Sequence, residues 1–191
     1  MMEASFLTRH PRLKDIGGFV IFVVCVIVGT LLINTFVFRS FSVTGPSMEQ
    51  TLYTGDRLIV NRLPVTMAHL QNNSYTPKRG QIIVFKNPLY SPGSEDMNLV
   101  KRVIAFAGER VTVKDGTLTV YNKEHPQGFH PDDSWDGPGS PTSGDTEVTV
   151  PEGSIFVAGD PRQGSYSLDS RNGLGTVPLY DVIGPVSLRL W

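Results

Sequence analysis

A run of 23 consecutive uncharged residues, Ile16–Phe38, constrains this chain more than any other feature of its sequence. As an α-helix the run is about 35 Å long, enough to cross a hydrocarbon core of about 30 Å with some tilt. Sixteen of the 23 residues are Val, Ile, Leu or Phe. Their favourable insertion, about 5 to 10 kcal/mol in total, outweighs the cost of Asn34 and three glycines. A run that is apolar on every face also exceeds what a domain of this size can bury as a core helix. We therefore expect residues 16–38 to form a transmembrane anchor.

The residues that flank the run predict the orientation of the anchor. Three basic residues precede it and one follows it: Arg9, Arg12, Lys14 and Arg39. Because short cytoplasmic flanks are enriched in Lys and Arg, residues 1–15 are expected in the cytoplasm and residues 39–191 on the outer side of the cell membrane. A cleaved signal peptide is the alternative, but its apolar region is about 7 to 15 residues long and ends in small residues. The bulky and charged residues 38–42 favour an uncleaved, single-pass anchor.

The composition of the chain narrows its class of fold and of partner. It has 17 Lys and Arg against 18 Asp and Glu, a net charge of -1 and 40% apolar residues. This balance argues against a disordered chain and against a protein that neutralises the phosphates of a nucleic acid. The 19 Gly and 14 Pro favour short elements joined by turns over a helical bundle. The single cysteine, Cys25, lies inside the apolar run, so the outer domain must be stable without a disulfide.

Short segments in which apolar and polar residues alternate recur beyond the apolar run. They are rich in β-branched residues and predict strands at residues 56–61, 81–85, 99–105, 110–114, 117–121, 154–158 and 185–191. Asp115-Gly116 lies between two of these segments and predicts a tight type I′ hairpin, since both residue types tolerate positive φ. Residues 122–149 are rich in Gly, Pro and acids and predict a loop-rich insertion, and residues 64–77 predict a second irregular stretch. The expected fold class is therefore mainly β.

Possible catalytic groups begin just beyond the apolar run. Ser47 lies in the turn Gly45–Met48, and a serine in such a turn is more often a turn former than a nucleophile. A Ser-His-Asp arrangement needs a histidine, and the candidates beyond the run all lie in irregular stretches: His69, His125 and His130. The last two, with the neighbouring Asp132 and Asp133, match no standard spacing of metal ligands. We therefore expect neither a histidine base nor a metal or other cofactor.

Lysine is the other base that a serine hydrolase can use. Lys101 follows Val100 on a predicted strand and shares a face with Val103 if the alternation holds. An unperturbed lysine pKa of about 10.4 leaves almost no neutral amine at pH 7, but apolar burial lowers that pKa by about two units or more. A neutral amine could then accept the proton of the Ser47 hydroxyl. The alternative is a lysine at the end of a strand that reaches water and has no catalytic role.

Four separated stretches, in order along the chain, resemble the type I signal peptidases, also called leader peptidases. These stretches are Gly45-Pro46-Ser47-Met48 with Gly55-Asp56, Arg79 to Phe85, Lys101 to Ala105 with Gly108-Glu109, and Gly159-Asp160 through Ser167-Leu168-Asp169-Ser170-Arg171. The resemblance extends from the apolar run nearly to the end of the chain. It implies a β-rich, partly barrel-like catalytic domain and no cofactor. It also implies a serine endopeptidase that uses a Ser-Lys dyad to remove signal peptides, after small residues, from exported preproteins at the outer membrane surface.

The resemblance further implies which residues perform the reaction. Ser47 would be the nucleophile and Lys101 the general base. Ser167 would orient the lysine amine, since a neutral amine must point at the hydroxyl that it deprotonates. Pro161 stands where the family usually has Asn, and the loop that follows is longer than usual. The register therefore leaves Ser165 as the alternative to Ser167, and the distance to the acid that follows favours Ser167.

Other residues of the four stretches would support these groups. Asp169 and Arg171 would brace the site. Met48, next to the nucleophile, would lie near substrate and bilayer. Gly45 holds the oxyanion-loop position, where some members have a serine, so the backbone N–H of Ser47 is the surest oxyanion donor.

Two alternatives stay open at the level of sequence. One is another Ser-Lys membrane peptidase, of protein maturation or conjugative transfer. The other is a non-enzymatic anchored β domain that binds envelope partners. Only the peptidases require Ser47 and Lys101 to meet in space. The expected partners are exported preproteins and the lipid bilayer, and no nucleic acid.

Overall fold

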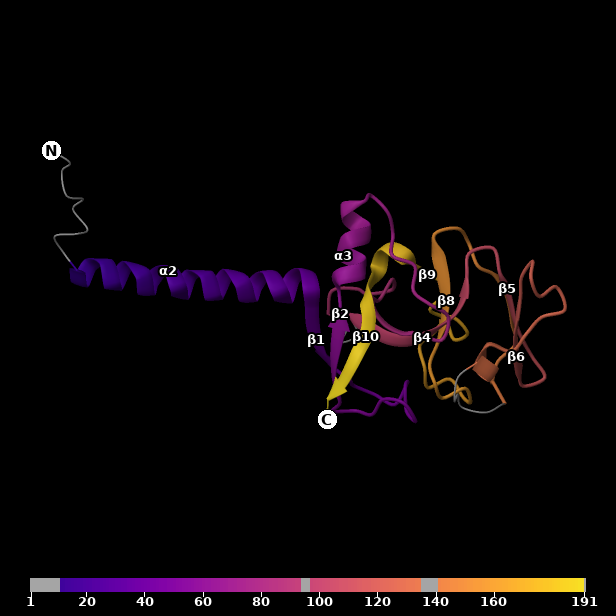
Figure 1. Ribbon diagram of the computed structural model, residues 1–191. Coiled ribbons are helices and arrows are strands. Elements are labelled where there is room, and N and C mark those ends of the chain that lie inside the picture. Colours follow the sequence, from indigo (N-terminus) through magenta and orange to yellow (C-terminus); the bar gives the residue numbers. More distant parts are fainter. Residues whose placement is uncertain (1–10, 94–96, 135–140, 191) are drawn as a thin grey trace.

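An isolated helix and a β domain make up the chain (Figure 1). The computed structural model describes residues 11–93, 97–134 and 141–190. Helix α2 (Pro11–Leu32) continues through a π-helical turn, η1 (Ile33–Val37), into strand β1 (Phe38–Ser42). The helical stretch Ile16–Val37 has a mean hydropathy of 2.9 and is apolar and long enough to cross a membrane. It ends one residue earlier than expected, because Phe38 is extended and pairs with Asn61 of the next strand.

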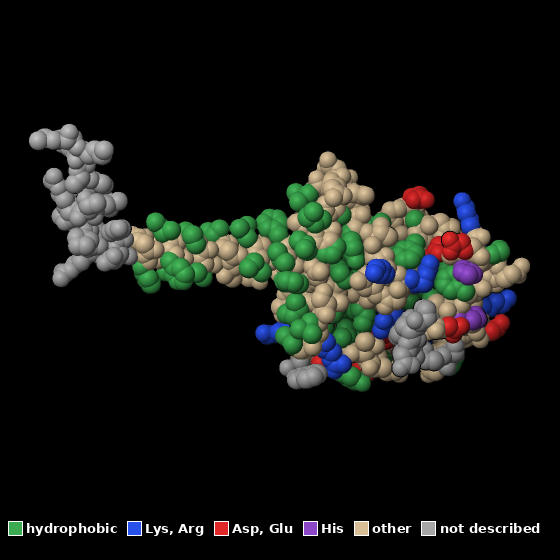
Figure 2. Space-filling model, viewed as in Figure 1, with side chains coloured by type: hydrophobic (Ala, Val, Ile, Leu, Met, Phe, Trp, Pro, Cys, Tyr) green, Lys and Arg blue, Asp and Glu red, His purple; other side chains and the backbone are tan. Residues whose placement is uncertain are grey.

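The apolar surface of the helix is open to its surroundings. Figure 2 shows hydrophobic side chains along the rod and on the adjoining end of the β domain, whereas acidic and histidine side chains gather on the half of the domain away from the rod. Phe19, Ile21 and Phe22 are each more than 60% exposed. Such a surface is unfavourable in water and favourable in lipid.

The strands form two antiparallel sheets. The larger has seven strands in the order β1-β2-β10-β3-β4-β8-β9, and the smaller has three in the order β6-β5-β7. Beyond β1, the larger sheet contains β2 (Arg57–Asn61), β3 (Ile82–Lys86), β4 (Asn98–Phe106), β8 (Ser154–Ala158), β9 (Val177–Pro178) and β10 (Val182–Leu190). The smaller sheet contains β5 (Arg110–Lys114), β6 (Thr117–Tyr121) and β7 (Thr146–Thr149). The mainly β fold class is confirmed.

Irregular pairing bends the larger sheet. The register shifts within β10 and within β4, and such bulges increase the twist and curvature of a sheet. The sheet therefore curls into a half-barrel, which brings the edge strand β1 and the central strand β4 to the same cleft, described below.

The predicted hairpin is present where the sequence placed it. Residue for residue, Arg110–Lys114 pairs with Thr117–Tyr121. Asp115 has φ 50° and Gly116 has φ 79°, the left-handed values that a type I′ turn requires. The hairpin prediction is confirmed.

Two stretches expected to be irregular contain regular structure. The first part of the stretch 64–77 belongs to helix α3 (Leu63–Leu70), which has Pro64 in its first turn, a favourable place for proline. Its Thr66 hydroxyl donates to the carbonyl of Phe36, 2.8 Å away, so α3 is held against the end of η1. In the expected insertion, β7 pairs with β5 and η2 (Pro131–Ser134) forms one 3-10 turn. Residues 135–140 of that insertion lie outside the described residues.

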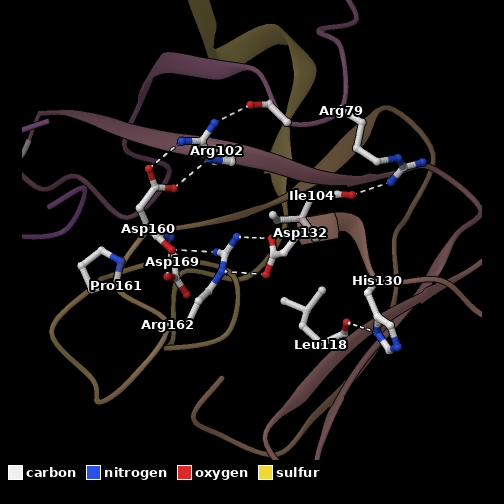
Figure 3. Close-up of polar contacts among 12 residues, drawn as sticks. Arg79, Arg102, Ile104, Leu118, His130, Asp132, Asp160, Pro161, Arg162 and Asp169 are labelled. Atoms are coloured by element: carbon white, nitrogen blue, oxygen red, sulfur yellow. Dashed lines mark hydrogen bonds and ion pairs between the residues drawn. The ribbon is translucent and has the colours of Figure 1, made fainter. Parts of the chain in front are cut away.

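Glu109 joins the end of β4 to the turn before β3. Its carboxylate accepts two hydrogen bonds from Arg79, at 2.7 and 2.9 Å, and one each from Asn122 and the Phe106 amide, both at 2.8 Å. Burial raises the pKa of Glu109, but the hydrogen bonds from Arg79, Asn122 and Phe106 outweigh burial and hold that pKa below its usual value. Figure 3 shows that Arg79 also reaches the carbonyl of Ile104.

The stabilising effect of Glu109 is expected to depend on pH. A carboxyl whose pKa is lower in the folded state contributes stability above its unfolded pKa of about 4.3 and loses it as pH falls through the folded pKa. Glu109→Gln should therefore lower the free energy of unfolding by about 1 to 3 kcal/mol at pH 7. Urea denaturation should show that the difference in the free energy of unfolding between wild type and Glu109→Gln becomes smaller as pH is lowered below 4. An equally large gap at pH 3 would contradict this assignment, and the exposed Glu124→Gln is the control.

Candidate active site

Ser47 lies in the loop that connects β1 to β2. The two ends of this loop are tied together, because the Val43 N–H donates to the Asp56 carbonyl at 2.9 Å and the Gly55 N–H donates to the Val43 carbonyl at 3.0 Å. Gly45 turns the chain with φ 87°, in the region that glycine favours. These contacts therefore restrict the position of the Ser47 hydroxyl.

The buried side chain of Met48 anchors the loop in the core of the domain. Its side chain is fully buried, in a core cluster with Leu58, Val60 and Val84. The resemblance implied a position near substrate and bilayer. The apolar faces of β2 and β3 cover Met48 inside the domain, and its proximity to substrate and bilayer stays a prediction.

Lys101 meets Ser47 from the centre of the larger sheet. It lies on β4 opposite Ile83 of β3, and its side chain is 1% exposed. Its Nζ donates a hydrogen bond to Ser47 Oγ at 2.7 Å and another to the Val100 carbonyl at 2.9 Å. The fold thus brings together two side chains that are 54 residues apart in the chain. A serine hydroxyl that contacts an amine can give up its proton to that amine when the amine is neutral.

A cleft of about 340 Å³ opens beside these two side chains. Residues 41–44 of the β1 end form one wall, residues 97–101 of the β4 start form the other, and Leu58 and Val84 also line it. Among the described strands β1 pairs with β2 alone, so its other edge has backbone groups available to an extended peptide. The cleft can therefore accept an extended peptide segment beside β1.

Ser167 lies next to the pair, across Gly159. A Cβ at Gly159 would be 2.2 Å from Ser167 Oγ and 2.4 Å from the backbone oxygen of Ser47. Only glycine fits this contact, which the sequence analysis did not identify. Ser167 is buried and Ser165 is exposed, which favours the chosen register. Ser167 Oγ has no hydrogen-bond partner among the described residues, so its role in orienting Lys101 stays a prediction.

Asp169 and Arg171 hold this contact in place. Their side chains are fully buried and form an ion pair of 2.6 Å. The Asp169 carboxylate also accepts a hydrogen bond from the Gly159 N–H at 2.8 Å. Arg171 also donates to the Arg162 carbonyl at 2.8 Å. A chain of contacts therefore runs from Arg171 through Asp169 and Gly159 to the backbone of Ser47.

Two further ion pairs, one buried and one partly exposed at its acid, fix the surroundings of the site (Figure 3). Arg102 donates to both carboxylate oxygens of Asp160, at 2.8 and 2.6 Å, and to Thr51 of the loop between β1 and β2 at 3.2 Å. Arg162 donates to both oxygens of Asp132, at 3.2 and 2.6 Å. The Asp132 pair fastens the insertion to the loop after β8. No local sequence pattern predicts either pair, because the partners are 58 residues apart in the first pair and 30 in the second.

The histidines lie away from this arrangement. His130 faces the carbonyl of Leu118 in the smaller sheet, 3.2 Å from its Nδ1 (Figure 3), and His125 packs on Phe129 with ring centroids 5.0 Å apart. Within the described ranges no group of His, Cys, Asp or Glu is arranged to hold a metal ion. Lys101 is therefore the side chain that contacts Ser47 Oγ as a possible base.

Comparison with known proteins identifies the family of this chain. The model of the family described as "Signal peptidase, peptidase S26" matches residues 15–191. The chain belongs to this family. A signal peptidase I of Bacillus licheniformis is 33% identical over 165 residues, which cover 85% of this chain and 81% of that protein. A signal peptidase IB of Staphylococcus aureus is 27% identical over 189 residues, covering 93% and 91%. A crystal structure of a signal peptidase I from Enterococcus faecalis matches with 28% identity and a TM-score of 0.44, covering 59% of this chain and 97% of that chain.

Membership of the signal peptidase family establishes the class of activity. Such enzymes are serine peptidases that act on preproteins carrying signal peptides, and the chain is a serine endopeptidase of this kind. The family and the enzyme class that the four motifs implied are confirmed. The alternative of a domain that only binds envelope partners is set aside.

Proposed function

We propose that this signal peptidase uses a Ser47-Lys101 dyad, and that it works as a single-pass membrane protein at the outer surface of the cell membrane. Its substrates are exported preproteins, cut after small residues. The observation that carries the proposal is the 2.7 Å hydrogen bond between Lys101 Nζ and Ser47 Oγ, made by a lysine that is 1% exposed.

The proposed reaction begins with an extended preprotein segment that adds to the free edge of β1. Ser47 Oγ attacks the carbonyl before the mature sequence while Lys101 Nζ accepts the hydroxyl proton. The backbone N–H of Ser47 donates to the developing oxyanion. The lysine ammonium then protonates the leaving amine. A water molecule that Lys101 deprotonates hydrolyses the acyl-enzyme and restores the dyad.

Burial supports the role of Lys101 as a base. An amine that is removed from water is harder to charge, so its pKa falls toward the working pH. Val100 and Leu99 line the cleft beside it, and the carbonyl of Val100 accepts a hydrogen bond from Nζ. This bond and the bond to Ser47 Oγ restrict the direction in which the amine points.

The position of the site next to the apolar helix supports the choice of substrate. Ser47 follows the end of the apolar stretch, Val37, by ten residues. A preprotein is itself held in the bilayer by an apolar segment, and confinement of both partners to one membrane raises their effective concentration. The basic residues Arg12 and Lys14, just before the apolar stretch, favour a cytoplasmic N-terminus.

Cleavage of a preprotein by the full-length enzyme in lipid vesicles tests the proposal. The substrate carries Ala at the last and third-last positions of its signal peptide, and N-terminal sequencing identifies the mature product. Ser47→Ala should reduce the rate by about 10⁴-fold or more. Ser187→Ala, at an exposed serine on β10 away from the cleft, should cleave like wild type. Cleavage by Ser47→Ala at the wild-type rate, or a wild type that cuts only its own chain, would contradict the proposal.

A further inference from the structure

A second pocket, of about 560 Å³, lies where the apolar helix joins the domain. Three cations line it, Arg39 at the start of β1, Arg62 after β2 and Lys86 at the end of β3, together with one acid, Asp181. Its aromatic lining residues are Tyr90 and Tyr180. The proposed cleavage mechanism uses none of these side chains.

Hydrogen bonds between Arg62 and the end of the apolar helix hold this pocket next to the last turn of that helix. The Arg62 N–H donates to the carbonyl of Val37 at 2.7 Å, and its guanidinium donates to the carbonyl of Thr35. Arg39 is the second residue after Val37. If residues 16–37 cross the bilayer, as proposed above, the pocket lies at the depth of the lipid headgroups.

The pocket has an excess of positive charge. Burial lowers the pKa of Arg62, and the neighbouring Arg39 lowers it further. The Nε of Arg62 is buried and has no hydrogen-bond partner within the described ranges. Burial raises the pKa of Asp181 while Lys86 opposes that rise, so this acid offsets one cation and leaves two. In the part of the chain that the structure describes, no ion pair involves Arg39 or Arg62.

Helix α3 adds an apolar surface beside the cations. Leu63, Met67 and Leu70 are 46%, 48% and 74% exposed, and their spacing places them on one face of the helix. Figure 1 shows α3 crossing the direction of α2 at the end of the domain where α2 emerges. A short helix in that position lies along the membrane surface, with its apolar face toward the acyl chains.

We propose that this pocket binds the phosphate diester of an anionic glycerophospholipid, with Arg39 and Arg62 as its charged donors and α3 against the acyl chains. The planar guanidinium groups suit a phosphate, which accepts paired hydrogen bonds from them. Basic pockets beside membrane helices recognise headgroups in this way. Met97 and Asn98 line both this pocket and the catalytic cleft, so a bound lipid would also support one wall of the cleft. The inference rests on the proposed membrane anchoring.

Lipid binding by the full-length protein in dodecyl maltoside micelles tests this assignment. Titration with dioleoyl phosphatidylglycerol, followed by native mass spectrometry, gives its apparent Kd. The double variant Arg39→Gln/Arg62→Gln should raise that Kd by about tenfold or more. Lys114→Gln/Lys123→Gln removes the same charge from exposed residues of the smaller sheet's strand ends and should leave the Kd unchanged. An equal loss in both double variants, or no loss in the first, would overturn the proposal.

Further variants separate the remaining explanations. Arg39→Gln alone, at an exposed residue, should weaken binding about threefold or more even if loss of the Arg62 bonds disturbs the helix junction. Inorganic phosphate at equal concentration should not displace the lipid; full displacement would make free phosphate the ligand and overturn the lipid assignment. Glu95 and Asp96 precede Met97 in the sequence. A tenfold gain in affinity in Glu95→Gln/Asp96→Asn would mean that the chain's own acids fill the pocket, which also overturns it.

The lipid assay is independent of peptide cleavage, since it contains no preprotein. Ser47→Ala should bind phosphatidylglycerol like wild type and fail only in the cleavage assay. Arg39→Gln/Arg62→Gln should fail in the lipid assay. The two proposals can therefore fail separately.

Discussion

Lys101→Met is expected to lower kcat/KM for preprotein cleavage by about 10⁴-fold or more while the domain stays folded. Methionine replaces the apolar stem of lysine, is one atom shorter, and suits a site that is 1% exposed. It has no nitrogen to accept the Ser47 proton across the 2.7 Å contact. The measurement is cleavage of a preprotein by the full-length enzyme in vesicles, together with circular dichroism to confirm folding.

A second substitution separates a base from a residue that only positions Ser47. Arginine at position 101 can still donate a hydrogen bond, but its guanidinium stays charged throughout the working pH range. Lys101→Arg should therefore be as inactive as Lys101→Met. Lys114→Met, at an exposed lysine on β5, is the matched control and should keep wild-type activity. Substantial activity in Lys101→Arg would contradict the dyad. In the wild type, kcat/KM should rise with pH until the Lys101 amine is neutral. A profile that is flat from pH 6 to 9 would also contradict the dyad.

The strands were predictable where they are specified locally. The segments 110–114, 117–121 and 154–158 agree with the structure to the residue, because alternation and a positive-φ turn are visible within each window. Strand β1 was not predicted, because Phe38 continues an apolar run whose length reads as helix. Strand β7 has only four residues and is stabilised by pairing with β5. Helix α3 depends on contacts with the end of η1, which no local pattern contains.

The candidate site was predictable from its motifs, and its supports were not. Ser47 and Lys101 belong to separate stretches whose combination identifies the family, and the structure places their side chains in contact. Asp132 was weighed only as a metal ligand, whereas it pairs with Arg162. A pair formed by two loops has no periodicity and no fixed spacing in the sequence. The need for glycine at 159 arises from the backbone of Ser47, which is distant along the chain.

Asp169→Ala is expected to lower the free energy of unfolding by about 3 to 5 kcal/mol, since it leaves the buried guanidinium of Arg171 without its counter-charge. Both side chains of this pair are 0% exposed, with 2.6 Å between Arg171 Nη2 and Asp169 Oδ2. The Gly159 N–H, 2.8 Å from Asp169 Oδ2, also loses its acceptor. Urea denaturation followed by circular dichroism at pH 7 measures the change.

An exposed ion pair in the same chain is the control for the effect of burial. Arg110 and Glu147 form an ion pair of 3.1 Å whose side chains are 43% and 70% exposed. Water screens such a pair and hydrates whichever partner remains, so Glu147→Ala should cost less than about 1 kcal/mol. If Asp169→Ala lowered the free energy of unfolding as little as Glu147→Ala, the buried charge of Arg171 would not need Asp169 as its counter-charge. A large cost for Asp169→Ala and a small cost for Glu147→Ala would attribute the difference to burial of the Arg171–Asp169 pair.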